Sequence, residues 1–223
     1  MATHHVLAAL GVEDRTYTLE EWEAVEQRTG EKFEYHAGRL VPWRMMAGGS
    51  AQHSQISGNL AYTLGVAVRN FAAEHPALPL CNVHSSDLRI KVQGADRYLY
   101  PDVAIVCGKP SFDARITTAI TNPVVIVEVL SPSSIRYDMG EKFAFYSQLD
   151  SLREYVLVEQ ADNIVEVRSR AAAGANWTPS FAKALDHEVH IPSLGLALPM
   201  REVYRGVEFD DAVEYEVNPA PHE

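Results

Sequence analysis

Apolar residues recur every three or four positions in the segment that begins near Ser50. This spacing places them on one face of a helix, so the sequence predicts a long helix here. His53 lies on the same apolar stripe, one turn before the first aliphatic member. The stripe comprises Ile56, Leu60, Leu64, Ala67 and Phe71.

Two shorter helices are predicted before and after this one along the chain. Thr18 and Glu21 have the spacing of a capping box, which predicts a helix from about Leu19 to Gln27. A further helix is predicted from roughly Tyr137 to Leu149. Lys142 falls on the apolar stripe of that helix rather than opposite it.

Alternating and continuous apolar runs predict the strands. Residues 88 to 92 alternate between aliphatic and charged side chains, which is typical of a half-buried strand. A second strand is predicted from Tyr98 to Val106. The run from Val124 to Leu130 is almost wholly β-branched and predicts a central strand. Two hairpins are also predicted, Phe33 to Trp43 with its turn near Ala37-Gly38, and Arg153 to Glu159 with Ile164 to Arg168.

The order of these elements predicts the fold class. Helix, strands, helix and strands in succession indicate an α/β (α+β) layer structure, in which a mixed β-sheet is flanked by helices. A chain of 223 residues fits one compact domain, which we place at residues 1–206. Residues 207–223 contain six acidic residues and no Lys or Arg, so we interpret them as an acidic C-terminal tail.

The charge of the chain bears on its partners. The formal net charge is −11, of which the tail supplies six negative charges. Such an acidic balance argues against a protein that coats nucleic acid through a broad basic face. Because much of the excess lies in the tail, and because a bound metal would neutralise clustered carboxylates, nucleic acid remains open as a partner.

The cysteines and the apolar runs predict the cellular setting. Cys81 and Cys107 lie far apart in sequence and show no zinc-ligand spacing, so we expect a reducing compartment and no disulfide framework. The N-terminus lacks the pattern of a signal peptide. The longest apolar run is far shorter than the roughly 20 residues of a membrane helix. These features predict a soluble, cytoplasmic protein without membrane association.

Two carboxylates are the first candidates for chemistry. Glu128 is the single polar residue of an otherwise aliphatic strand, where an ionised carboxylate is costly unless a cation or several donors meet it. Asp102 follows Pro101 just before an apolar run. If the strands are neighbours, the two acids would form an oxygen-ligand site that suits magnesium. The alternatives are that Glu128 reaches solvent or pairs with Arg, and that Asp102 bonds to its own turn.

Three further residues are candidates with open alternatives. Lys142 either has a catalytic role or only pairs with Asp138 one helical turn away. His53 either works in a site or is a satisfied core histidine. Glu34 shares its strand face with Lys32 and His36, a pattern that favours a solvated side chain.

An ordered set of short motifs runs from about residue 17 to residue 170. They are Phe33-Glu34-Tyr35-His36-Ala37-Gly38, Gln52-His53, Pro101-Asp102-Val103-Ala104, Glu128-Val129-Leu130-Ser131-Pro132-Ser133, Asp138-Met139-Gly140-Glu141-Lys142, Tyr146 and Arg153-Glu154-Tyr155-Val156-Leu157-Val158. In these motifs the chain resembles the Uma2 (DUF820) family of proposed endonucleases, an offshoot of the PD-(D/E)XK restriction-endonuclease-like superfamily. The run from Glu128 to Ser133, followed by Asp138 and Lys142, is the most specific part.

The resemblance implies a restriction-endonuclease-like fold and a set of site residues. Asp102 and Glu128 would bind one or two divalent metals, with help from the backbone carbonyl of Val129. Leu130 stands where the superfamily has the lysine of Glu-X-Lys, and the resemblance implies that Lys142 supplies the ammonium instead. It also implies that Glu34 is a further metal ligand. His53 would line the site or contact a phosphate.

The function that follows is metal-dependent hydrolysis of DNA. The resemblance implies an endonuclease that uses Mg²⁺ or Mn²⁺ to hydrolyse phosphodiester bonds. A homodimer is plausible because two-fold symmetry matches a duplex. The alternative is a non-catalytic interaction or regulatory protein that keeps the fold with a vestigial metal site. The acidic balance and the missing Glu-X-Lys lysine favour this alternative.

Overall fold

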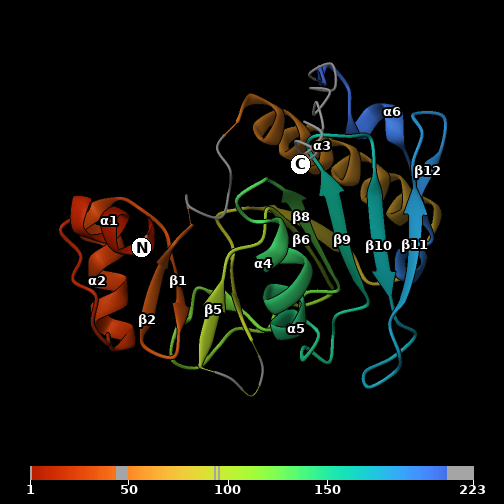
Figure 1. Cartoon of the computed structure of the whole chain (residues 1–223). Coiled ribbons are helices and arrows are strands. Elements are labelled where there is room, and N and C mark those ends of the chain that lie inside the picture. Colours follow the sequence, from red (N-terminus) through yellow and green to blue (C-terminus); the bar gives the residue numbers. More distant parts are fainter. Residues whose placement is uncertain (1, 44–49, 93, 95, 210–223) are drawn as a thin grey trace, which may run out of the picture.

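The computed structural model describes residues 2–43, 50–92, 94 and 96–209, with the side chains of residues 2–5 left out. It shows a mixed α+β architecture in which sheets are flanked by helices, as the sequence predicts (Figure 1). The residues 210–223 of the predicted tail lie outside the described part. Val207 and Phe209, at its start, pack against the main core. No described helix is long and apolar enough to cross a membrane.

The larger sheet has six strands in the order β11-β10-β9-β8-β6-β3. Strand β8 (Val125–Leu130) lies between two neighbours and all of its residues are buried, which confirms the predicted central strand. It pairs in parallel with one neighbour and antiparallel with the other. The strands around it are β9 (Glu154–Glu159), β10 (Val165–Ser169), β11 (Thr178–Ala182), β6 (Val103–Cys107) and β3 (Cys81–Ser85).

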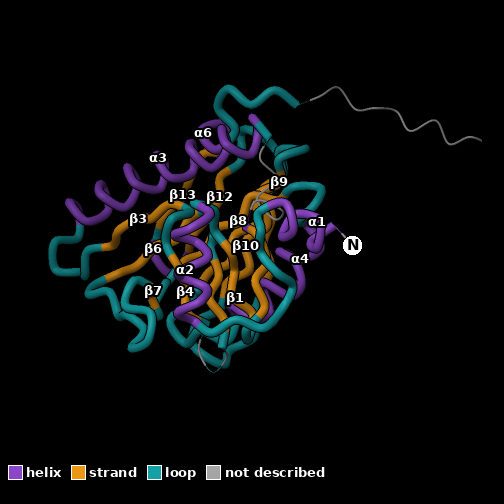
Figure 2. The backbone as a smooth tube through the Cα atoms, turned by 90° about the vertical axis from the view of Figure 1, so that its left-hand side faces the viewer, coloured by secondary structure: helices purple, strands orange, loops and turns teal. Residues whose placement is uncertain are grey.

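Helix α3 (Ala51–Glu74) crosses one face of this sheet (Figure 2). Its N-cap is Ser50, whose hydroxyl accepts a hydrogen bond from the backbone of His53, as expected for a helix that starts there. The predicted apolar stripe packs on Val103, Val127 and their neighbours. The same layer holds the small sheet of β12 (Glu188–Ile191) and β13 (Leu196–Pro199), the 3₁₀ helix η3 (Pro192–Leu194) and helix α6 (Met200–Val203).

The second sheet has five strands in the order β2-β1-β5-β4-β7 and carries the N-terminal helices (Figure 1). Helix α2 (Leu19–Thr29) starts with the predicted capping box between Thr18 and Glu21. The predicted hairpin forms from β1 (Phe33–His36) and β2 (Arg39–Pro42). The other elements are α1 (Ala2–Ala9), β4 (Arg89–Lys91), β5 (Arg97–Leu99) and β7 (Ala119–Ile120).

One predicted strand is wrong in its extent. The run from Tyr98 to Val106 does not form a single strand, because β5 ends at Leu99 and β6 begins at Val103 in the other sheet. Pro101 lies in the break, where it has no N–H to donate to a ladder. The chain therefore changes sheets immediately before Asp102.

The helix predicted after β8 forms, but with a local change of winding. It consists of α4 (Ile135–Tyr137), a π-helical turn η2 (Asp138–Lys142) and α5 (Phe143–Tyr146). It covers the sheet face opposite α3. On that face, Phe143 and Tyr146 pack in one apolar cluster with Ile126 and Leu130 of β8. Such π turns are rare and often occur at functional sites. In this one, Asp138 and Lys142 are both buried.

The expectation that the two cysteines form no disulfide is wrong. Cys81 and Cys107 form a disulfide in the structure. They are direct partners in the antiparallel register of β3 and β6, so the fold brings together two residues that are 26 positions apart. Sequence spacing alone does not reveal this pairing, because β3 lacks a clear alternating pattern.

Candidate active site

The ammonium of Lys142 is the centre of a buried cluster of acids. Its Nζ lies 2.8 Å from Oε2 of Glu128, 3.5 Å from Oδ1 of Asp138 and 3.6 Å from Oε1 of Glu34. It also donates to the carbonyl oxygen of Tyr100 at 3.1 Å. The alternative that Lys142 pairs only with Asp138 is therefore wrong. These contacts join β1, β8 and η2.

The charge state of the cluster follows from its composition. Burial lowers the pKa of Lys142, but the three carboxylates outweigh burial and hold that pKa well above its usual value. One ammonium does not offset three ionised carboxylates in a buried site. Burial accordingly raises the pKa of Glu128 far above its usual range and raises that of Asp138, against the opposing effect of Lys142. The cluster therefore has an excess of acid over base that a further cation would relieve.

The two carboxylate oxygens of Glu128 differ in their contacts. The residue is only 2% exposed, so its carboxylate does not reach solvent from the strand. While Oε2 contacts Lys142, Oε1 has no hydrogen-bond partner among the described residues. Oδ1 of Asp138 likewise accepts no hydrogen bond there. Buried oxygens of this kind require a partner, and a cation is one that suits them.

Glu34 is fully buried, which contradicts the solvated side chain that its alternation predicts. Its Oε2 accepts from Tyr137 at 2.6 Å and lies 3.0 Å from Nε2 of His36. Its Oε1 accepts from the backbone of Tyr100 at 3.4 Å and faces Lys142. Burial acts to raise the pKa of Glu34, but Lys142 and His36 lower it further than burial raises it. Because protein donors occupy both oxygens, the contacts favour a role in positioning Lys142.

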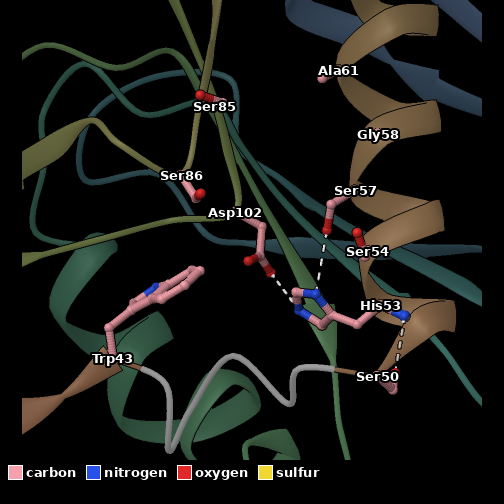
Figure 3. A pocket seen from close by; sticks show the side chains of 10 residues that line it. All are labelled: Trp43, Ser50, His53, Ser54, Ser57, Gly58, Ala61, Ser85, Ser86 and Asp102. Atoms are coloured by element: carbon pink, nitrogen blue, oxygen red, sulfur yellow. Dashed lines mark hydrogen bonds and ion pairs between the residues drawn. The ribbon is translucent and has the colours of Figure 1, made fainter. Parts of the chain in front are cut away.

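Asp102 and His53 form a second part of the site. Oδ2 of Asp102 accepts the backbone N–H of Val129 at 2.7 Å and lies 3.3 Å from Nε2 of His53 (Figure 3). His53 is buried on α3, and its Nδ1 lies 3.5 Å from the hydroxyl of Ser57. The contact with Asp102 lacks hydrogen-bond geometry, so Nε2 has no hydrogen-bond partner among the described residues.

The sheet register brings the two predicted acids to neighbouring positions. Val103 of β6 is opposite Val127 of β8 in an antiparallel pair. Asp102 and Glu128 are the next residues in the same direction along the two strands. The hydrogen bond from Val129 to Asp102 ties the strands together at this point. Asp102 opens to the cleft beside α3, while Glu128 contacts Lys142.

The donor set fits a magnesium-type cation in part. The residues that the structure describes contain no group of three His, Cys, Asp or Glu side chains spaced to hold a metal. Magnesium, however, is commonly bound by one or two carboxylates and several waters. Asp102 and Glu128 are two carboxylates on adjacent strand positions, and Oε1 of Glu128 has no hydrogen-bond partner among the described residues. Glu34 does not add a free oxygen to it.

Three site residues are absent from the sequence-based candidates. His36, Tyr137 and Asp138 contact the cluster, although the sequence presents Asp138 as a helix partner of Lys142 and as part of a family motif rather than as a site residue. Burial raises the pKa of the Tyr137 hydroxyl, which keeps it a donor to Glu34. The apolar face on which Lys142 lies is the one signal that could have indicated these neighbours.

Three buried acids thus gather around one lysine where β1, β8 and η2 meet. The structure is similar to a crystal structure described as "a putative nuclease belonging to DUF820" from Anabaena variabilis, with a TM-score of 0.59 and 15% sequence identity. The match covers 79% of this chain and 91% of that chain. At this level of identity the similarity shows a common fold.

Sequence comparison assigns the family. The Uma2 family, described as "Putative restriction endonuclease", matches residues 18–201. This chain therefore belongs to the Uma2 family. Two proteins of Synechocystis sp. are each 33% identical to it. The match to "Uncharacterized protein slr1290" covers 85% of this chain and 92% of that protein, and the match to "Uncharacterized protein sll1609" covers 64% and 75%.

Proposed function

We propose that this protein is a divalent-metal-dependent endonuclease that hydrolyses phosphodiester bonds of DNA. The observation that carries the proposal is Glu128, a carboxylate buried in a central strand with one oxygen unpartnered among the described residues. Asp102 lies at the neighbouring position of the adjacent strand, and Lys142 lies 2.8 Å from Glu128. Membership of the Uma2 family supports the same reaction class.

Asp102, Glu128 and the carbonyl of Val129 would hold Mg²⁺ or Mn²⁺. The bound cation supplies Lewis-acid polarisation of the phosphodiester and of water. The backbone N–H of Val129 fixes one oxygen of Asp102, so this carboxylate is oriented before substrate arrives. Figure 3 shows the other oxygen of Asp102 directed away from His53.

Lys142 and His53 would complete the chemistry with fixed charge and hydrogen bonding. The three carboxylates keep Lys142 protonated, and its positive charge offsets negative charge that develops on the phosphate. Glu34 positions this ammonium and is itself held by Tyr137 and His36. His53 presents Nε2 beside Asp102, where it can contact a phosphate oxygen.

A cleavage assay tests the proposal. Supercoiled plasmid and circular single-stranded DNA are incubated with the protein and Mg²⁺ or Mn²⁺, with a chelator as the negative condition. Asp102→Asn and Glu128→Gln keep the size of each side chain and remove its charge, and both should abolish cleavage. Glu166→Gln is the matched control, because this carboxylate pairs with Arg168 on β10. Cleavage by either site variant at the wild-type rate rejects the assignment.

A second candidate is a non-catalytic interaction or regulatory protein with a vestigial metal site. It is favoured by the short contact between Lys142 and Glu128, in which an ammonium already neutralises a predicted ligand, and by the lack of a three-ligand group in the described part of the chain. Thermal melting with and without millimolar Mn²⁺ distinguishes the two. A cation at 100 times its Kd stabilises the folded state by about 2.7 kcal/mol. An unchanged midpoint favours the second candidate.

Homodimerisation stays a prediction. Two copies related by a two-fold axis would match the symmetry of a duplex and allow both strands to be cut. Sedimentation of the full chain measures its mass in solution directly. A species of twice the chain mass of 24.7 kDa supports the prediction, and a monomer across the micromolar range contradicts it.

A further inference from the structure

A cleft of about 650 Å³ lies beside the proposed metal site, between α3 and the segment that leads from β3 to β4. Asp102 and His53 open into it from its inner wall (Figure 3). The volume is that of a small-molecule or single-nucleotide pocket. Its other lining residues are Trp43, Ser50, Ser54, Ser57, Gly58, Ala61, Ser85 and Ser86.

One wall of the cleft is a narrow polar face of α3. Ser54 and Ser57 lie about one turn apart on this face, and Gly58 and Ala61 follow them along the helix with little or no side chain (Figure 3). Serine hydroxyls both donate and accept hydrogen bonds, so they suit the oxygens of a sugar-phosphate. Ser50 is the N-cap of this 24-residue helix, and a helix N-terminus favours anions.

A buried ring nitrogen without a hydrogen-bond partner indicates that this wall can bind a ligand. His53 is only 6% exposed, and its Nε2 faces the cleft without a hydrogen bond to any residue the structure describes. A buried ring nitrogen in this condition is costly unless something binds to it. A phosphate oxygen would satisfy it while lying next to Asp102.

The opposite wall is an aromatic platform. Trp43 points toward the interior of the cleft across from His53 (Figure 3). The indole is half-buried and held in place by Lys32, whose Nζ lies 4.7 Å from its ring centre and whose carbonyl accepts the backbone N–H of Trp43 at 2.9 Å. The same Nζ donates to the carbonyl of Ser86, which connects Trp43 to the other edge of the cleft. A fixed indole of this kind offers a face for stacking a base.

The charge around the cleft disfavours a duplex. Proteins that grip double-stranded DNA derive most of their affinity from Lys and Arg at the phosphates. Among the described residues that line the cleft, none is Lys or Arg. Single strands also use basic groups at their phosphates, but they gain in addition about 1–3 kcal/mol per base from stacking on aromatic side chains, which a paired base cannot offer. The cleft supplies an aromatic face for stacking, and the ammonium of Lys32 lies at its edge against Trp43 and Ser86.

From these observations we infer that the cleft binds one nucleotide of single-stranded DNA. Its base stacks on Trp43, and its sugar-phosphate lies along the serine face of α3. The adjoining phosphate accepts a hydrogen bond from Nε2 of His53. The inference names the substrate class for the proposed nuclease and rests on that function for its biological meaning. It assigns Trp43 as the residue that selects single strands over duplex.

Fluorescence anisotropy tests the inference. The full chain is titrated into a labelled 12-nucleotide single strand and into the duplex of the same sequence, both in EDTA so that binding is separated from cleavage. We expect the single strand to bind at least tenfold more tightly. Trp43→Ala should weaken single-strand binding by about tenfold, because a stacked base is lost. Trp43→Phe keeps an aromatic face and should restore most of the affinity.

The control is Phe112→Ala, which removes an exposed aromatic ring that does not line the cleft and should change neither affinity. Thermal melting of each variant confirms that it is folded. Equal or tighter binding of the duplex overturns the inference, as does a Trp43→Ala variant that binds both forms as the wild type does. Metal-dependent cleavage without single-strand preference would refute this inference alone. Single-strand preference without cleavage would refute the proposed function alone.

Discussion

Replacing Lys142 by Met should destabilise the protein in a pH-dependent way. The substitution keeps an unbranched side chain of similar length and removes the ammonium that lies within 3.6 Å of Glu34, Glu128 and Asp138. Removing one partner of a buried ion pair costs about 3–5 kcal/mol. We expect a loss in this range for the free energy of unfolding at pH 8.

The pH dependence follows from the direction of each pKa shift. In the wild type, Lys142 has a raised pKa, so its contribution is fully present below its unfolded pKa of 10.5 and is lost only above that. Glu128 and Asp138 have raised pKa values, so the folded state loses stability as the pH rises from their unfolded values of 4.5 and 3.8. In the Lys142→Met variant, no ammonium of residue 142 offsets this loss of stability. The deficit of the variant should therefore be larger at pH 8 than at pH 5.

Urea denaturation followed by circular dichroism, at pH 5 and pH 8, measures the effect. Lys183→Met, at an exposed lysine, is the control and should change stability by less than about 0.5 kcal/mol. Adding Glu128→Gln to Lys142→Met should restore part of the stability at pH 8, because one of the uncompensated carboxylates is gone. A Lys142→Met variant within about 1 kcal/mol of the wild type, or equally destabilised at both pH values, would refute the description of the cluster.

Two further predictions concern the scaffold, and thermal or urea unfolding checks both. Thr18→Ala removes one half of the capping box of α2 and should cost about 1 kcal/mol, whereas an unchanged midpoint would show that this cap is dispensable. Reducing the disulfide between Cys81 and Cys107, which closes a loop with a sequence separation of 26, should lower stability by about 3–4 kcal/mol. Identical unfolding with and without reductant would contradict that expectation.

Much of the fold is predictable because single elements carry strong local signals. The capping box of Thr18 marks the start of α2, and the β-branched run before Glu128 marks β8. The edge strand β3 escapes prediction because it is half exposed and lacks alternation. The break at Pro101 is missed because the apolar pattern continues across it while the chain passes from one sheet to the other.

Residue patterns predict the site best where a charge interrupts an apolar run. Glu128 and Lys142 meet that condition, and the structure places their side chains in contact. Glu34 is misjudged by its alternation because β1 is buried on both of its faces. Its contact with Tyr137 joins residues that are 103 positions apart, and no local pattern encodes a pairing of that range.

The central claim is that Asp102 and Glu128 together bind a divalent cation. The most direct measurement is a crystal structure of the protein soaked in Mn²⁺, in which anomalous scattering locates the metal. We predict a peak bound by oxygens of both carboxylates. A well-ordered site without such a peak, with Glu128 still closed on Lys142, would contradict the claim.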